Sequence, residues 1–151
     1  MQEIIQPPAF QRPSGKLYLS APQLNLIDMM PIKVLFDAIA PNYADGIEDL
    51  VNNRITITLP GFYDVVAHAI LNEVIADKAY AILIYLNGLA AQHDLKHSSN
   101  VNFLGLGYSL PCYLDTGDFL EVFITSYAGA DTVDVYGGVP IQTFLAVQRV
   151  R

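Results

Sequence analysis

The fold is decided by one stretch, Asn53-Arg54-Ile55-Thr56-Ile57-Thr58-Leu59-Pro60-Gly61-Phe62-Tyr63-Asp64-Val65. Its first half alternates large apolar residues with threonines, and a period of two is typical of a half-buried strand. The Pro60-Gly61 pair interrupts this pattern, and an apolar run follows from Phe62 to Leu71. We therefore predict a strand, a tight break and a second, more buried strand.

The rest of the chain repeats this pattern of short strands separated by turn signals. A helix over residues 65–80 is the alternative for one segment, but β-branched and aromatic residues on either side favour a strand. Asn87-Gly88 predicts a hairpin turn, and Leu89-Ala90-Ala91 begins the return strand. We expect the histidine-containing stretch His93–His97 that follows to form a polar loop. Further strands are predicted at residues 16–19, 32–36, 79–86, 102–114, 119–127, 132–136 and 143–150. Many short strands with almost no helical pattern predict an all-β sandwich or barrel.

Composition narrows the classes of partner. The chain has 151 residues, enough for one domain with a substantial core. Only 15% of them are charged, against roughly 25% in an average soluble domain. So few charges suggest that part of the surface contacts other protein. The net charge of −7 argues against a nucleic-acid or anionic-membrane partner.

The N-terminal residues and the cysteine content indicate a compartment. Residues 1–8 lack the basic region and apolar core of a signal peptide. The most apolar stretch, Ala79–Ala91, is too short to span a bilayer as a helix. Cys112 is the single cysteine, so no intrachain disulfide can form, and we expect a buried, inert thiol. These features predict a soluble protein made in a reducing cytoplasm.

The sequence contains no recognisable catalytic or metal-binding motif. There is no nucleophile elbow, zinc motif or evident pair of catalytic carboxylates. His93 and His97 would need a third ligand to hold a metal, and the acidic loop Pro41–Asn53 does not fit the calcium-binding pattern. His68 is predicted to be a packed or interface histidine. We expect no enzyme, no cofactor and no metal, so a chelator should leave the melting temperature unchanged.

Residues 1–31 differ from the rest because they hold five of the nine prolines. Proline disfavours both helix and central strand, so we predict an extended N-terminal arm followed by a domain at residues 32–151. The arm has two interpretations: it is an ordinary first strand on the domain's own sheet, or it docks on a neighbouring subunit. The residues that would dock are apolar: Ile4, Ile5, Phe10, Leu24 and Leu26.

Three segments carry a resemblance to a known family. They are Arg54–Ile57 leading into Pro60-Gly61-Phe62-Tyr63-Asp64-Val65, then Leu114–Val122 with Gly117-Asp118 inside it, and finally Thr143–Val147. In this order they resemble the globular head of complement component one-q and the wider tumour-necrosis-factor-like jelly rolls. The hairpin Ile82–Gly88 is also similar. Ala146 and Val147 depart from the pattern, because glycine and phenylalanine are usual there. The resemblance covers residues 32–150.

The resemblance implies a jelly-roll β-sandwich of about ten antiparallel strands that assembles as a homotrimer. Our interpretation of the predicted strand 119–127 agrees with this. Its alternation predicts that Leu120, Val122 and Ile124 fill the sandwich core. The trimer-interface candidates are the aromatic residues on the opposite face: Phe119, Phe123 and Tyr127.

Two functions are compatible with such a domain. Domains resembling this one occur in phage particles, and the first hypothesis is a bacteriophage virion structural protein. It would be a capsid decoration (cement) protein or a fibre or tail component, attached to the major capsid or another virion protein. It would reside in the virion, assembled in the host cytoplasm. The alternative is a trimeric receptor- or glycan-binding recognition head, with the candidate tyrosines Tyr108, Tyr113 and Tyr136.

Overall fold

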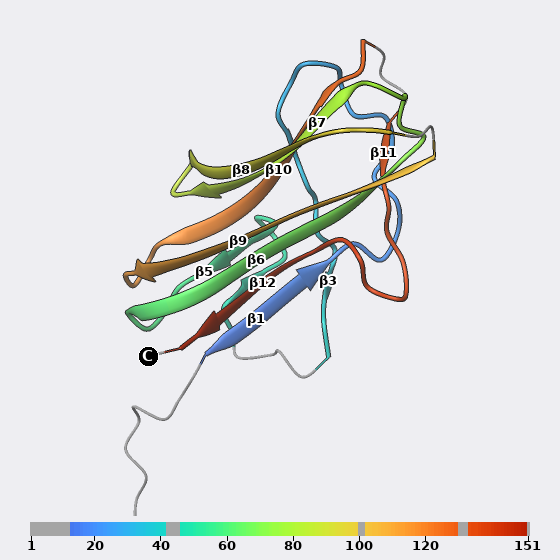
Figure 1. Cartoon of the computed structure of the whole chain (residues 1–151). Helices are drawn as coiled ribbons and strands as arrows, with labels where there is room; N and C mark the ends of the chain where they lie inside the picture. The colour runs from blue at the N-terminus through green and yellow to red at the C-terminus, as the bar shows by residue number, and fades with distance from the viewer. Residues whose placement is uncertain (1–12, 42–45, 100–101, 130–132, 151) are drawn as a thin grey trace, which may run out of the picture.

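The chain folds into two packed β-sheets (Figure 1). The computed structural model describes residues 13–41, 46–99, 102–129 and 133–150, and these residues contain twelve β-strands and no helix. All pairings between the strands are antiparallel. The predicted all-β sandwich is therefore confirmed.

The first sheet, sheet A, is built around one long strand, β6 (Gly61–Asn72). β9 (Phe103–Leu114) pairs with the whole of one side of β6. The other side pairs with β12 (Phe144–Arg149) and, beyond it, with β11 (Asp134–Val135). β1 (Ser14–Tyr18) and β3 (Ala38–Ile39) extend the sheet from β12.

The second sheet, sheet B, has β10 (Phe119–Tyr127) and β7 (Ala79–Leu86) at its centre. β8 (Leu89–His97) continues the sheet from β7. On the other side of β10 lie β2 (Ile32–Lys33), β5 (Arg54–Thr56) and then β4 (Glu48–Asp49). In Figure 1, β7, β8 and β10 form one layer, and β1, β6, β9 and β12 form the other.

The stretch that decides the fold also links the two sheets. β5 belongs to sheet B, whereas β6 belongs to sheet A. The chain crosses between them at Pro60-Gly61, where the Tyr63 hydroxyl donates a 2.5 Å hydrogen bond to the Leu59 carbonyl. The predicted break therefore has a larger consequence than a turn, because it places two consecutive strands on opposite sides of the core.

The predicted core face of the central strands is confirmed. Leu120, Val122 and Ile124 of β10 are buried and belong to one cluster with the inward residues of β6. Those residues are Tyr63, Val65, Ala67, Ala69 and Leu71. The hairpin turn is confirmed as well, because Asn87 and Gly88 have φ values of 52° and 83°, as such a turn requires.

Two segments predicted as loops contain strands. β4 lies inside the predicted loop Pro41–Asn53, and β8 covers His93–His97, where we expected a polar loop. The reason is the same in both cases: an outer strand is held by backbone pairing with its neighbour and needs few buried side chains. The return strand begins at Leu89, as predicted, but the polar composition of His93–His97 concealed that it continues to His97.

The predicted boundary at residue 31 needs correction. β1 pairs with β12 over its whole length, and Leu17, Leu19 and Leu26 are buried in the core. The proline content led to the prediction of a separate arm, but Pro13 and Pro22 lie outside the β1 ladder and do not interrupt it. The described part of residues 1–31 is thus integral to the sandwich, as the interpretation as an ordinary first strand requires. Residues 1–12 lie outside the described residues.

Candidate functional site

The surfaces that can carry function are the outer faces of the two sheets. Among the described residues, no group of three His, Cys, Asp or Glu side chains is placed to hold a metal ion. The described part of the chain also contains no helix that is long and apolar enough to cross a membrane.

The structure brings the three trimer-interface candidates together on the outer face of sheet B, where they alternate along β10. Two of them already pack inside the subunit. The Arg54 guanidinium carbon lies 4.1 Å from the Phe119 ring centroid, and the Tyr85 and Phe123 ring centroids are 4.0 Å apart. Tyr127 is 45% exposed. This face therefore offers less free aromatic surface than the alternation predicts.

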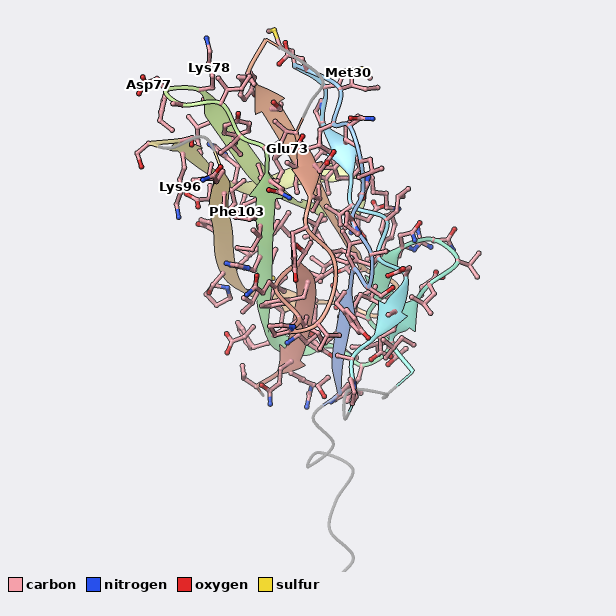
Figure 2. The ribbon with its side chains drawn as sticks, turned by 90° about the vertical axis from the view of Figure 1, so that its right-hand side faces the viewer. Met30, Glu73, Asp77, Lys78, Lys96 and Phe103 are labelled. Atoms are coloured by element: carbon pink, nitrogen blue, oxygen red, sulfur yellow. The ribbon has the colours of Figure 1, made fainter. Side chains whose placement is uncertain are left out.

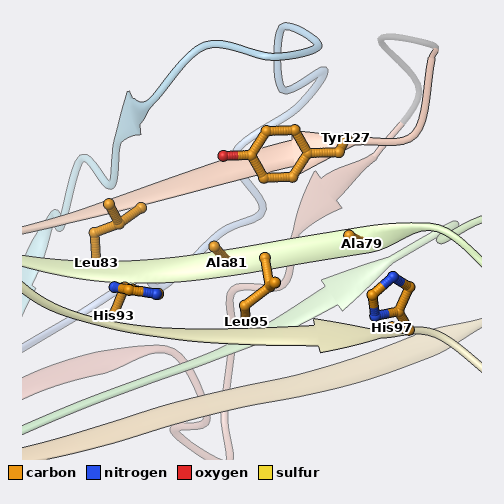
Figure 3. Close-up of a pocket in the computed structure, with 7 residues that line it drawn as sticks. All are labelled: Ala79, Ala81, Leu83, His93, Leu95, His97 and Tyr127. Carbon is orange, nitrogen blue, oxygen red and sulfur yellow. The ribbon is translucent and has the colours of Figure 1, made fainter.

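Beside Tyr127, the same face has a groove of about 550 Å³ (Figure 3). β7 contributes Ala79, Ala81 and Leu83, and β8 contributes His93, Leu95 and His97. The alanines lie on the central strand, between Tyr127 on β10 and the imidazoles on β8. The sequence prediction missed this groove because it assigned His93–His97 to a loop. The sequence signal that could have revealed the strand is the period of two after the Asn87-Gly88 turn, because His93, Leu95 and His97 lie on one face of β8.

The strand geometry also separates the two histidines. His93 and His97 lie on the same face of β8, four residues apart. At about 3.4 Å per strand residue, their Cα atoms are roughly 13 Å apart. A helix would have placed them one turn apart, whereas the strand places them too far apart to share one metal ion.

The outer face of sheet A carries the larger exposed apolar surface. Phe62 and Val66 of β6 are 42% and 36% exposed, and Phe103 and Tyr113 of β9 are 55% and 53% exposed. Phe62 and Tyr113 meet edge to face, with ring centroids 5.4 Å apart. Phe103 pairs with Asn72 at the other end of β6, ten residues and thus roughly 34 Å from Phe62, so it lies apart from the others. Phe62, Val66 and Tyr113 lie toward one end of the two strands and form a surface of the kind that marks protein interfaces. We call these three residues the sheet A patch.

His68 lies on the same face and is packed, as predicted. Its ring stacks on Phe144 with a centroid separation of 5.8 Å, and its Nδ1 lies 2.5 Å from the Gln142 carbonyl oxygen. Gly107 of β9 is directly opposite, where an added Cβ would lie 3.1 Å from the imidazole. Glycine at position 107 therefore gives the His68 ring room to pack against β9.

The other candidates are scattered. Among the candidate tyrosines, Tyr113 is exposed, whereas Tyr108 packs against the core and Tyr136 is half-buried. Burial, and to a lesser degree the Asp118 carboxylate, raises the pKa of the Cys112 thiol. This favours the protonated form and agrees with an inert cysteine.

The docking candidates of the predicted arm also separate. Leu24 is 64% exposed, but Leu26 is only 1% exposed and belongs to the core, so Leu26 is not available to a partner. Ile4, Ile5 and Phe10 lie outside the described residues. Near Leu24 the chain exposes Met29 and Met30, and Met30 lies at the same end of the sandwich as the Asp77–Lys78 turn (Figure 2).

Comparison with known proteins supports the fold. No family model matches the sequence, and no curated protein matches it either. Among solved structures, the Eiger TNF protein from S. frugiperda superposes with a TM-score of 0.70 at 10% identity, covering 93% of each chain. Murine APRIL superposes with a TM-score of 0.68 at 14% identity, covering 93% of this chain and all of APRIL. The chain thus has the jelly-roll fold of TNF-like proteins.

Proposed function

We propose that this protein is a homotrimeric structural component of a virus particle, which acts by binding other proteins and has no catalytic activity. The observation that carries the proposal is the sheet A patch. It leaves Phe62, Val66 and Tyr113 in water on an isolated subunit. Such a surface, on a chain with only 15% charged residues, is best explained by burial against further protein.

In the proposed trimer, the sheet A patch packs against neighbouring subunits. Burying a large apolar side chain contributes roughly 1.5–3 kcal/mol, before the costs of association are subtracted. The outer face of sheet B is the weaker candidate for this contact, because Phe119 and Phe123 already pack on Arg54 and Tyr85. The trimer would leave that face free.

Attachment to a shell would use other surfaces. We propose that exposed Leu24, together with Ile4, Ile5 and Phe10 of the predicted arm, contacts the major capsid or another virion protein. Leu24 is suited to this role because it is 64% exposed. Three symmetry-related copies of such a contact would add avidity, so that loss of one contact per subunit has a steep effect.

Co-sedimentation with particles that lack the protein tests attachment. We expect the full chain to sediment with the particles at a fixed stoichiometry, and we expect Leu24→Asp to reduce the bound fraction. Val51→Asp is the matched control, because Val51 is 91% exposed in a different loop. A protein that is found only as a free secreted oligomer, and never in purified particles, would contradict the virion assignment.

The second candidate function is a trimeric recognition head that binds a receptor or glycan. The exposed Tyr113 ring favours it, because an exposed aromatic ring offers a flat apolar surface and a hydroxyl. This candidate requires a trimer that forms through a face other than the sheet A patch, so that Tyr113 stays in water. On a glycan array, this candidate predicts binding, whereas a purely structural virion protein predicts none.

A further inference from the structure

The groove on the outer face of sheet B has the dimensions of a ligand site. Its volume of about 550 Å³ lies within the range of roughly 300–1,000 Å³ that is usual for ligand pockets. The hollow has a simple cause: Ala79 and Ala81 on β7 are small, and longer side chains stand on the strands to either side. Figure 3 shows these alanines between Tyr127 and the β8 side chains.

Three polar side chains border the groove and are not engaged elsewhere. Among the described residues, the rings of His93 and His97 and the hydroxyl of Tyr127 have no hydrogen-bond partner. His68 on sheet A differs, because it contacts both Gln142 and Phe144. A neutral imidazole offers one donor and one acceptor, and a phenol offers both. The groove border can therefore give and accept hydrogen bonds.

Charge narrows the class of ligand. The protein carries a net charge of −7, yet no Asp, Glu, Lys or Arg is among the described residues that line the groove. The charged residues of β8 point to the other side: Lys96 Nζ lies 3.3 Å from the Gly105 carbonyl, and the Gly107 amide lies 3.5 Å from Asp94 Oδ2. The groove thus lacks a counter-charge for a phosphate, a sulfate or a cation.

A neutral ligand must then cover the apolar alanine floor and also form hydrogen bonds with the polar side chains at the border of the groove. A purely apolar side chain would cover the alanines, but it would take the imidazoles and the phenol out of water without giving them partners. A sugar ring meets both demands, because its C–H face is apolar and its hydroxyl groups are donors and acceptors. With the ring over Ala79 and Ala81, its hydroxyls would lie toward Tyr127 and His97, which flank Ala79, whereas His93 flanks Leu83 and would meet a second sugar unit.

We propose that this groove binds a neutral saccharide, with a pyranose ring over Ala79 and Ala81 and beside Tyr127. The proposal deepens the second candidate function, since it names a ligand class and a site on sheet B distinct from Tyr113. It requires neither a virion nor a trimer. Its success or failure is therefore separable from that of the structural proposal.

Saturation-transfer NMR on the full chain tests the site. The probes are neutral saccharides: the methyl glycosides of glucose, galactose and mannose, N-acetylglucosamine, lactose and maltose. We expect at least one to bind with millimolar affinity. Ala81→Leu, which fills the floor, and Tyr127→Ala, which removes one wall, should each weaken binding by at least about tenfold. Val51→Ala, in the exposed turn between β4 and β5, is the matched control and should leave the affinity unchanged. Tyr113→Ala reports whether the site lies on sheet A instead.

Other outcomes overturn the proposal. Absence of binding by every probe removes it, and binding that survives Ala81→Leu but fails in Tyr113→Ala moves the site to sheet A. Tighter binding of sialyllactose than of lactose contradicts a neutral site. N-acetyl-phenylalanine amide is a further probe; if it binds the groove and the sugars do not, the occupant is a peptide side chain. Melting temperature and molecular mass are measured on each variant, so that loss of binding is distinguished from loss of structure.

Discussion

At the scale of single residues, Gly137 lies where the chain crosses itself. A Cβ added there would lie 2.1 Å from the Ala21 carbonyl oxygen, a backbone atom that cannot rotate away. We predict that Gly137→Ala destabilises the fold by about 1–3 kcal/mol or more. Gly88→Ala is the comparison, because an added Cβ meets nothing within 4 Å there and the cost is that of a positive φ, about 1 kcal/mol. Equal melting temperatures for the two variants would contradict the close approach of Gly137 to the Ala21 backbone.

Asp49 gives a prediction about pH. The side-chain amide and backbone N–H of Asn52 donate hydrogen bonds of 2.8 and 3.1 Å to its carboxylate and hold the pKa of Asp49 below its ordinary value of 3.8. A depressed folded-state pKa contributes stability above the unfolded pKa, and that contribution is lost as the pH falls through the folded pKa.

We therefore expect Asn52→Ala to lower the melting temperature at pH 7 and to have little effect at pH 2. Thermal melts of both proteins across this pH range measure the difference. Val51→Ala is the neighbouring control and should show no such pH dependence. A loss for Asn52→Ala that is the same at pH 2 and pH 7 would show that the carboxylate is not the group that Asn52 stabilises.

Residue-scale features divide into those that the sequence predicts and those that it does not. The inward direction of Leu120, Val122 and Ile124 follows from alternation and is confirmed. The partners of their outward neighbours do not follow, because Arg54 reaches Phe119 from a strand far away in sequence. Alternation predicts a side chain's face, whereas its partner depends on which strands pair.

At the scale of elements, the β7–β8 hairpin is joined to β10 by the Asn87 side chain. Asn87 donates a 2.9 Å hydrogen bond to Asp118 and accepts a 3.0 Å hydrogen bond from the Phe119 amide. It also has a φ of 52°, which asparagine tolerates better than most residues.

We predict that Asn87→Ala destabilises the protein by about 1–2 kcal/mol, because it removes both hydrogen bonds and strains the turn. Asn87→Gly should recover the part that comes from the backbone. Chemical denaturation of the parent, Asn87→Ala and Asn87→Gly proteins measures the contribution of the hydrogen bonds and that of the backbone conformation. If Asn87→Ala is as stable as the parent, the turn does not depend on this side chain.

The same hairpin shows why the groove could not be predicted. The turn was predicted correctly at Asn87-Gly88, but a stretch rich in histidine, aspartate and lysine has low apolar content and resembles a loop. It forms β8 because β7 supplies the hydrogen-bond partners. The groove depends on this strand, so the assignment of His93–His97 to a loop also excluded the groove from the sequence prediction.

At the scale of the molecule, residues 13–31 decide how the chain can be shortened. Removing residues 1–31 would delete β1 and the core residues Leu17, Leu19 and Leu26. We predict that this chain fails to fold cooperatively, whereas a chain lacking residues 1–12 keeps every contact described above and melts cooperatively. Circular dichroism melts of the two chains measure this. A cooperative melt after removal of residues 1–31 would show that β1 is dispensable.

The architecture was largely predictable from sequence, and the functional surfaces were not. Period-two alternation and the order of the three family-like segments predict a jelly roll, and the fold comparisons confirm it. The sequence does not tell which outer face keeps its apolar residues free. Phe123 is covered by Tyr85, whereas Phe62 and Tyr113 stay exposed while contacting each other. That difference arises from strand register and becomes visible only in three dimensions.

The central claim is a homotrimer built through the sheet A patch, and molecular mass in solution tests it most directly. Light scattering at micromolar concentration should give about three times the chain mass of 16.6 kDa. Val66→Asp places a carboxylate in the patch and should give a folded monomer, whereas Val51→Asp should remain trimeric. A parent chain that is monomeric, or a Val66→Asp variant that stays trimeric, would contradict the claim.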